Sequence, residues 1–315
     1  MGFESKYIWM DGRLVEFEKA TIPFLNPALH YGLGVFEGIR CYSTQRGPAI
    51  FRAQDHMQRL LHSAHILGFR ALPYSADDLV AAARETVRAN GFQACYIRPL
   101  IYLSGTPASL NLDSGEARVG IATWEWEDYL GKEARERGVR ANVSSFTRHA
   151  PNVMMTKAKI TGNYANSVLA KTESTRLGFD EAIMLDPQGF VAECTGENLF
   201  LVKGGEIYTP PAADILEGIT RDSLFHLAED MGCPVTETQV SRDQLYIADE
   251  VFVCGTAAEV IGVTEIDYRA IGRGSVGPLT RQLQQAFSDV VHGKHKRSEV
   301  WLEFLSSLTT ETLSH

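Results

Sequence analysis

The chain has 315 residues, which is enough for about two domains with sizeable cores. Hydrophobic residues make up 44% and charged residues 22%, a composition typical of a soluble globular protein and not of a disordered chain. The formal net charge of -9 disfavours a nucleic-acid or anionic-membrane partner. No apolar run reaches the roughly 18 residues of a spanning helix, so we expect an intracellular enzyme or binding protein for a small molecule.

The cysteines and histidines point to a reduced compartment and to no metal site. The cysteines are far apart in the sequence, at Cys41, Cys95, Cys194, Cys233 and Cys254, and no two form a C-x-x-C pair. This pattern favours free thiols over a disulfide framework. The nine histidines show no metal-ligand spacing, and the first six residues lack the apolar region of a signal peptide. We therefore expect a cytoplasmic protein without a metal.

Strand and helix signals are mixed along the first 126 residues. Runs of β-forming residues and the Asp11-Gly12 turn predict strands. Apolar residues at helical spacing ahead of Gly68 and Gly91 predict two amphipathic helices. In chain order, the predicted elements are a hairpin of residues 7–10 and 13–15, helices 51–67 and 76–90, and strands 95–103 and 117–126.

The charged, hydrophilic stretch 127–137 predicts an interdomain connection between domains 1–126 and 138–315. The second domain repeats the mixture of strands and helices without strict alternation, which favours the α+β class. Its predicted elements are strand 139–146, helix 163–177, hairpins 181–186/190–193 and 198–203/206–208, helices 220–231 and 279–291, and a tail helix 298–308.

Two lysines, Lys157 and Lys159, lie in a segment with few other charges, just before the run Gly162-Asn163-Tyr164. A lysine between a strand and a helix start can be a covalent amine for a carbonyl cofactor if the site partly desolvates it. Two solvated surface lysines are the more frequent reading of such a segment. The segment alone leaves both readings open.

A phosphate-bearing aldehyde cofactor needs an amine, an acid for its ring nitrogen and a cradle for its phosphate. Gly218 and Thr220 open a predicted helix, and helix starts bind anions through backbone N–H groups. Thr256 lies in a turn with further donors, and Arg59 could add a charge-assisted bond. Glu193, at a strand end, is a candidate acid. Each of these alone is more often an ordinary cap, turn or surface charge.

Together these residues fall in long blocks that resemble a known family. The blocks include His30-Tyr-Gly-Leu-Gly-Val-Phe-Glu-Gly-Ile-Arg40, Lys159-Ile-Thr-Gly-Asn-Tyr164 and Glu193-Cys-Thr-Gly-Glu-Asn-Leu-Phe200. Further matching blocks are residues 7–12, 96–100, 218–222 and 248–259. The chain thus resembles the branched-chain amino-acid aminotransferases, a class IV family with the two-domain α+β architecture of fold-type IV pyridoxal-phosphate enzymes. The resemblance extends from about residue 7 to residue 287.

The resemblance implies a role for each cofactor residue. Lys159, and not Lys157, would form the Schiff base with pyridoxal 5'-phosphate and carry the 1,3-proton shift. Glu193 would bind the ring nitrogen and Tyr164 the phenolic oxygen. The phosphate would be held by Arg59, Gly218, Ile219, Thr220 and Thr256. The implied reaction moves the amino group of L-leucine, L-isoleucine or L-valine to 2-oxoglutarate.

The resemblance also implies a substrate pocket and a homodimer or higher homo-oligomer. Arg98 and Tyr31 would bind the side-chain carboxylate of glutamate, with Tyr31 reaching in from a partner subunit. The apolar pocket would be formed by Phe36, Gly38, Tyr96, Trp126 and Tyr129. The Thr256-Ala257 turn would bind the substrate's α-carboxylate. The partners are therefore expected to be amino acids, 2-oxo acids and a second copy of the chain, with neither nucleic acid nor membrane.

Three departures from the family pattern concern substrate range. Loop 105–113 lacks the usual Gly-Val-Asn-Pro run, Glu127-Asp128 replaces Gly-Ala, and Asn26-Pro27 replaces a Ser/Thr-His pair. These changes are compatible with added activity on aromatic amino acids or (R)-amines. The alternatives are a D-amino-acid or (R)-amine transaminase on the same scaffold, an aminodeoxychorismate lyase, and a non-catalytic binder.

Overall fold

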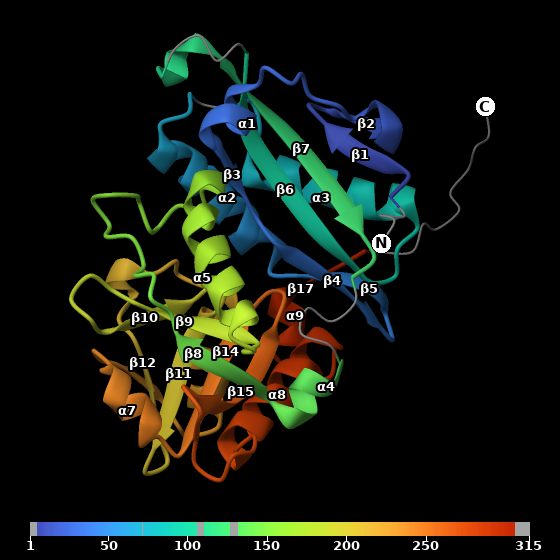
Figure 1. Cartoon of the computed structure of the whole chain (residues 1–315). Helices are drawn as coiled ribbons and strands as arrows, with labels where there is room; N and C mark the ends of the chain where they lie inside the picture. The colour runs from blue at the N-terminus through green and yellow to red at the C-terminus, as the bar shows by residue number, and fades with distance from the viewer. Residues whose placement is uncertain (1–4, 71, 106–109, 127–131, 306–315) are drawn as a thin grey trace.

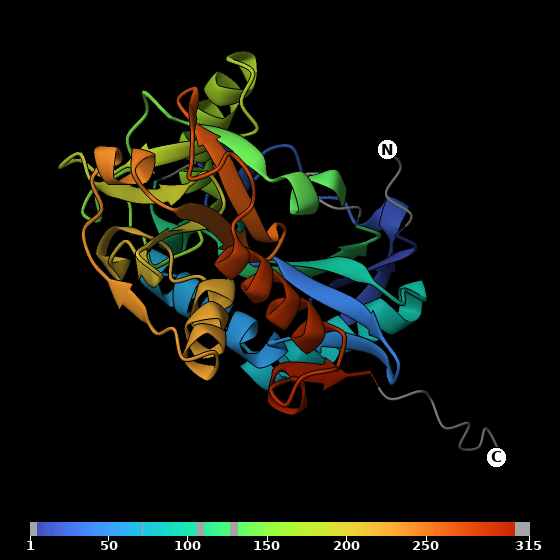
Figure 2. The same ribbon diagram turned by 90° about the horizontal axis from the view of Figure 1, so that it is seen from below.

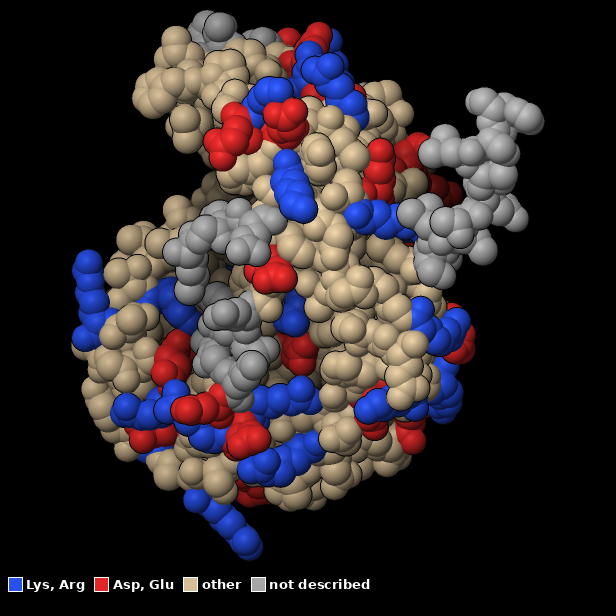
Figure 3. All heavy atoms as spheres, turned by 90° about the vertical axis from the view of Figure 1, so that its right-hand side faces the viewer, with Lys and Arg blue, Asp and Glu red and all other residues tan. Residues whose placement is uncertain are grey.

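The computed structural model describes residues 5–70, 72–105, 110–126 and 132–305. These residues form two large β-sheets, one in the upper and one in the lower half of Figure 1. In the part of the chain that the structure describes, no helix is both long and apolar enough to cross a membrane. Charged side chains of both signs are interspersed on the face shown in Figure 3.

The first sheet has eight strands in the order β17-β5-β4-β6-β7-β1-β2, with β3 paired to β6. Helices α2 (Ala53–Leu67) and α3 (Ala76–Asn90) cover one face, as Figure 1 shows. The strands are β1 (Tyr7–Met10), β2 (Arg13–Glu16), β3 (Gly34–Phe36), β4 (Ile39–Thr44), β5 (Gly47–Phe51), β6 (Cys95–Ser104), β7 (Glu116–Trp124) and β17 (Leu302–Phe304).

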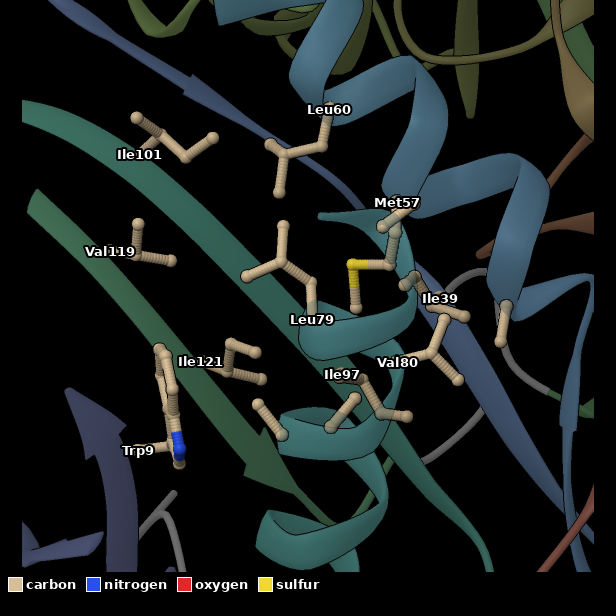
Figure 4. Packing of buried hydrophobic residues seen from close by; sticks show 14 of the residues in the cluster. Trp9, Ile39, Met57, Leu60, Leu79, Val80, Ile97, Ile101, Val119 and Ile121 are labelled. Carbon is tan, nitrogen blue, oxygen red and sulfur yellow. The ribbon is translucent and has the colours of Figure 1, made fainter. Parts of the chain in front are cut away.

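The core of this half lies between the sheet and the two helices. Figure 4 shows Met57 and Leu60 of α2 and Leu79 of α3 packed against Ile97 and Ile121 of the central strands. These five side chains are fully buried. Apolar burial of this kind stabilises a fold by about 25 cal/mol per Å². It also fixes the rotation of α2, and hence the direction of its polar face.

The second sheet has nine strands in the order β10-β9-β8-β15-β14-β11-β12-β13, with β16 paired to β15. Its strands are β8 (Val139–Val143), β9 (Glu181–Leu185), β10 (Val191–Cys194), β11 (Asn198–Lys203), β12 (Glu206–Thr209), β13 (Val235–Glu237), β14 (Glu250–Gly255), β15 (Glu259–Ile266) and β16 (Arg269–Ala270). The helices described beyond α3 are α4 (Lys132–Arg137), α5 (Tyr164–Arg176), α6 (Ile219–Asp230), α7 (Arg242–Tyr246), α8 (Pro278–Val291) and α9 (Ser298–Trp301).

A further apolar core joins the two halves. Helix α8 contributes Phe287, whose ring lies 5.4 Å from that of Phe51 at the end of β5. Phe51 also meets the ring of Trp301, with centroids 6.1 Å apart. Figure 2 shows α8 lying beside the strands β4 and β5 of the other half. The two sheets are therefore held in contact by packed side chains.

The structure confirms most of the predicted elements, shortens the predicted strand 139–146 to Val139–Val143, and corrects two others. Helix 76–90 is confirmed residue for residue, because a Ser75–Asp78 capping box starts it and Gly91, at φ 74°, ends it. The predicted helix 51–67 begins only at Ala53, since Phe51 pairs with Leu302 in the first sheet.

The predicted tail helix 298–308 is confirmed for Ser298–Trp301 and wrong for residues 302–305, whereas residues 306–308 lie outside the described ones. Residues 302–304 form β17, which pairs with β5 of the first sheet. Trp301 and Leu305 are nevertheless buried, so the tail packs through the two expected side chains. Part of the predicted connection, residues 132–137, is helix α4, whereas residues 127–131 lie outside the described ones. The division into domains 1–126 and 138–315 stays a prediction.

Candidate active site

One pocket lies where α2 of the first half meets the loops and helix starts of the second. Every residue predicted to touch the cofactor lines it. These residues are Arg59, Lys159, Tyr164, Glu193, Gly218, Ile219, Thr220 and Thr256. They come from five separate segments of the chain, so only the tertiary fold brings them together.

The structure separates the two neighbouring lysines. Lys159 extends into the pocket, where its Nζ donates to the Oη of Tyr164 at 2.7 Å. Its backbone is fixed because its N–H donates to Ser63 Oγ at 3.1 Å and its C=O accepts from Phe36 N–H at 3.0 Å. Lys157 Nζ instead donates to the Ala212 carbonyl and lies 3.0 Å from Glu217 Oε1. Lys159 is therefore the amine available for chemistry.

Glu193 is a buried carboxylate at the end of β10. Its Oε1 lies 2.6 Å from Nε of Arg148, and its Oε2 accepts from Asn198 Nδ2 at 3.3 Å. Burial raises the pKa of Glu193 above its ordinary value, while the charges of Arg148 and Lys159 oppose that rise. Glu193 is therefore a carboxyl group held in a dry setting beside one paired cation.

The start of α6 forms one end of the pocket. Gly218 is its N-cap residue and offers no side chain to the N–H groups of the first turn. A helix start without a side-chain cap leaves these donors, and the positive end of the helix dipole, for an anion. A Cβ at this position would lie 2.0 Å from Asn198 Oδ1, so any other residue would have to displace that side-chain amide. Arg59 Nη1 donates to the Glu217 carbonyl at 2.6 Å, which brings its guanidinium to the same helix end.

A second group of predicted residues adjoins the pocket through Phe36. The Phe36 ring lies 4.8 Å from that of Tyr164 and 5.1 Å from Lys159 Nζ. The Arg98 guanidinium lies 4.8 Å from the Phe36 ring centre and 5.2 Å from that of Tyr96. Predicted residues that make up this group are Phe36, Gly38, Tyr96, Arg98 and Trp126.

Three close contacts shape the aromatic wall formed by Phe36, Tyr96 and Trp126. Tyr96 stacks on Trp126, with ring centres 4.5 Å apart. A Cβ on Gly38 would lie 2.0 Å from Tyr96 Oη, so only glycine lets this ring approach the backbone. Arg98 Nη2 also donates to Tyr96 Oη at 3.4 Å. The wall is therefore apolar, with one guanidinium held in it.

Other predicted residues do not line the pocket within this chain, or cannot be placed. Tyr31 belongs to the short helix α1 (Pro27–Tyr31) and is 44% exposed. Ala257 lies in the same turn as Thr256, between β14 and β15. Tyr129 lies outside the described residues, as do Glu127 and Asp128 and part of loop 105–113.

Sequence reasoning missed several polar residues of the site. Arg148 belongs to a separate segment, and nothing in the sequence signals its pairing with Glu193. Asn198 lies in the same matching block as Glu193, and that block is the signal that could have found it. Glu197 also lines the pocket, and burial together with the nearby charge of Glu181 raises its pKa to about 8.

The chemistry of these side chains fits a phosphate-bearing aldehyde cofactor. Lys159 supplies an amine and Glu193 a buried carboxylate that can bind a protonated ring nitrogen. Arg59 and the uncapped start of α6 supply donors for a phosphate at the other end of the same pocket. The three functions lie in one cavity, as the cofactor's shape demands.

Comparisons with known proteins agree with this reading. Residues 34–266 match the family model described as amino-transferase class IV. The branched-chain-amino-acid aminotransferase of Pseudomonas aeruginosa is 47% identical over 294 residues, which cover 93% of this chain and 95% of that protein.

Solved structures give the same answer. A branched-chain amino acid aminotransferase from T.th., solved with pyridoxamine 5'-phosphate, superposes with a TM-score of 0.92 at 46% identity, covering 96% of this chain and 100% of that one. Its complex with N-(5'-phosphopyridoxyl)-L-glutamate gives a TM-score of 0.91 at 45% identity, with the same coverage. The pocket and these matches together show that the chain belongs to the class IV aminotransferase family, whose cofactor is pyridoxal 5'-phosphate.

Proposed function

We propose that this protein is a transaminase that moves the amino group of L-leucine, L-isoleucine or L-valine to 2-oxoglutarate. The carrying observation is the pocket in which the Lys159–Tyr164 pair and the Glu193–Arg148 pair face one cavity beside an apolar wall. The names of the relatives support the same substrates.

When bound, pyridoxal 5'-phosphate supplies the carbonyl that takes the amino group and the ring that withdraws electrons from the substrate's Cα. Lys159 Nζ would take the proton from the substrate's Cα as a general base and then, as an acid, deliver it to the former carbonyl carbon of the cofactor. Tyr164 Oη, 2.7 Å away, orients this amine. Glu193 would bind the protonated ring nitrogen, and the charge of Arg148 opposes the rise in the pKa of Glu193 that burial causes.

The aromatic wall explains how one pocket can take two kinds of side chain. Phe36, Tyr96 and Trp126 offer apolar surface to a branched aliphatic chain. A glutamate carboxylate in the same place would cost several kcal/mol if it were unpaired. Arg98, held between the rings of Phe36 and Tyr96, supplies the partner without removing the apolar surface.

A cofactor spectrum and an amino-donor screen test this proposal. With 2-oxoglutarate as acceptor, we expect turnover of L-leucine and little of D-alanine or (R)-1-phenylethylamine. Absence of L-leucine turnover would defeat the proposal. Pyruvate release without an acceptor would instead mark a lyase.

A matched pair of lysine variants assigns the amine. Lys159→Ala should lose both the visible absorbance band of the bound cofactor and the activity. Lys157→Ala should keep the band, because Lys157 contacts the carbonyl of Ala212 and not the pocket. Loss of the band in both variants, or in neither, would contradict the assignment to Lys159.

We also propose a homodimer that buries the surface around α1. Ile22, Phe24, Leu25, Leu29 and Tyr31 are 44–77% exposed on α1 and the loop before it. Contiguous exposed apolar surface is typical of subunit interfaces, and two-fold dimers are the commonest assembly. In such a dimer Tyr31 would reach the partner's pocket. Sedimentation should show a dimer that Leu29→Asp weakens, and an active monomer would contradict this proposal.

The cellular location is a further part of the proposal. All five cysteines are free thiols, and four of them are buried. Unpaired cysteines are typical of proteins in a reducing compartment. This supports a cytoplasmic enzyme, which cell fractionation would test directly.

A further inference from the structure

A buried polar cluster adjoins the pocket through Arg59. It consists of Glu37, between β3 and β4, and of His56 and Arg59 on α2. Glu37 is 0% exposed and His56 is 1% exposed. Of the three, only Arg59 lines the pocket. The other two therefore act on the pocket through Arg59.

Glu37 grips one edge of the Arg59 guanidinium. Arg59 Nε donates to Glu37 Oε1 at 2.6 Å, and Arg59 Nη2 donates to Glu37 Oε2 at 2.9 Å. This two-point contact fixes both the position and the plane of the guanidinium. His56 Nδ1 lies 2.8 Å from Glu37 Oε2 and so fixes the carboxylate in turn.

Counting N–H groups shows which edge of Arg59 remains available. A guanidinium has five N–H donors in a rigid plane. Nε and one N–H of Nη2 are taken by Glu37, and one N–H of Nη1 is taken by the Glu217 carbonyl at 2.6 Å. The remaining N–H groups of Nη1 and Nη2, the two donors left for a ligand, make up what we call the end-on fork of the guanidinium. That fork has the spacing to bind two oxygens of one phosphate.

The protonation states agree with this geometry. Burial raises the pKa of Glu37, but the charges of Arg59 and His56 outweigh it and hold the pKa well below its usual value. Burial lowers the pKa of His56. Glu37 is thus ionised and accepts, so His56 carries a proton on Nδ1, where it donates to Glu37.

We propose that Glu37, braced by His56, is a positioning residue that aims the end-on fork of Arg59 at the cofactor phosphate. This inference rests on the proposed phosphate role of Arg59. An arginine held only by its flexible side chain would lose rotamer freedom on binding the phosphate. Because Glu37 already orders the guanidinium in the free protein, this loss of rotamer freedom does not weaken phosphate binding.

The test compares ligands with and without a phosphate. Pyridoxamine 5'-phosphate and pyridoxamine share the ring and the amine, and neither forms a covalent bond with Lys159. Their dissociation constants are measured by calorimetry on the cofactor-free full-length chain and on Glu37→Gln. Glutamine keeps the shape of Glu37 but turns an N–H toward Arg59 or His56. We expect the variant to bind pyridoxamine 5'-phosphate about tenfold to a hundredfold more weakly. Its affinity for pyridoxamine should be unchanged.

Two further comparisons separate positioning from folding. Glu250→Gln is the matched control, because Glu250 is equally a buried acceptor but caps α8 through Leu279 and Thr280. It should leave the ratio of the two affinities as in the wild type. His56→Leu should lower the affinity for pyridoxamine 5'-phosphate. His56→Asn, which keeps an N–H donor for Glu37, should restore that affinity. This pair also carries the test if Glu37→Gln does not fold.

The outcomes distinguish the phosphate role of Arg59 from the positioning role of Glu37. If the wild type binds both ligands equally well, the proposed phosphate role of Arg59 fails. If the wild type prefers the phosphate ligand and Glu37→Gln has the same preference, Glu37 does not position Arg59. Equal weakening of both ligands in Glu37→Gln would likewise overturn the inference, since it would reveal a structural role only.

Discussion

Replacing Arg148 by methionine tests the electrostatics around Glu193. Arg148 Nε and Glu193 Oε1 are 2.6 Å apart, and each side chain is only 9% exposed. At an effective dielectric constant of about 20, two unit charges at this distance attract by about 6 kcal/mol. Part of that energy offsets the cost of removing both charges from water. Arg148→Met should therefore destabilise the fold by about 3–5 kcal/mol while Glu193 stays ionised.

The loss should depend on pH in a definite direction. Burial raises the pKa of Glu193 and Arg148 opposes the rise, so the variant has a still higher pKa. An acid whose pKa is higher in the folded than in the unfolded state stabilises the fold below its unfolded pKa. That contribution is lost as the pH rises through the folded pKa. The variant should thus be most impaired at alkaline pH and recover as Glu193 takes up a proton.

Urea denaturation midpoints of the cofactor-free chain measure this between about pH 5 and pH 8. The control is Arg140→Met, because Arg140 pairs with Glu265 at the same 2.6 Å but with side chains 44% and 29% exposed. Solvent screens that pair, so its loss should be small and nearly independent of pH. The proposed coupling between Arg148 and Glu193 is refuted if Arg148→Met loses no more stability than Arg140→Met, or if its loss of stability is the same at every pH.

Three further substitutions test the aromatic wall and Glu197, the second acid of the pocket. Arg98→Met should raise the KM for 2-oxoglutarate about tenfold to a hundredfold and leave that for L-leucine nearly unchanged; equal rises in both would contradict this. Gly38→Ala should raise the KM for L-leucine, because its Cβ would lie 2.0 Å from Tyr96 Oη, and an unchanged KM would show that the ring moves freely. Burial and Glu181 raise the pKa of Glu197 to about 8, so the wild type should lose stability as the pH rises toward that value. Glu197→Gln should flatten this slope in urea denaturation, and parallel slopes would rule out Glu197 as its source.

Local signals in the sequence predicted the elements that carry their own start and stop. Helix α3 matched to the residue because Ser75 and Gly91 fix its ends without help from the rest of the chain. Strand β17 could not be predicted in the same way. Its residues form a strand only because β5 offers an unpaired edge, and that edge lies far away in the sequence.

The site shows the same division. Lys159 and Glu193 lie in long blocks that the family resemblance could identify. Glu37 lies in such a block too, but its function depends on two side chains of α2 that reach it only in the folded protein. Arg148 has no local signal at all, since its partner was fixed by the tertiary fold. The sequence therefore identified Lys159 and Glu193, which act on the cofactor, but not the roles of Glu37 and Arg148, which contact residues of the site.

The pairing of β17 with β5 has a consequence for synthesis on the ribosome. The strands β1 to β7 are made first, yet the edge of β5 is completed by Leu302, Glu303 and Phe304, which are translated after all the other described strands. Until then the nascent chain presents an uncovered sheet edge, which other strands can pair with. Arg84 of α3 likewise lacks its ion-pair partner Glu303, which lies 2.9 Å away in the folded protein, until that residue has been translated. The first half of this protein thus cannot reach its final form as a separate cotranslational unit. Its sheet is completed only after residues 302–304 have been translated.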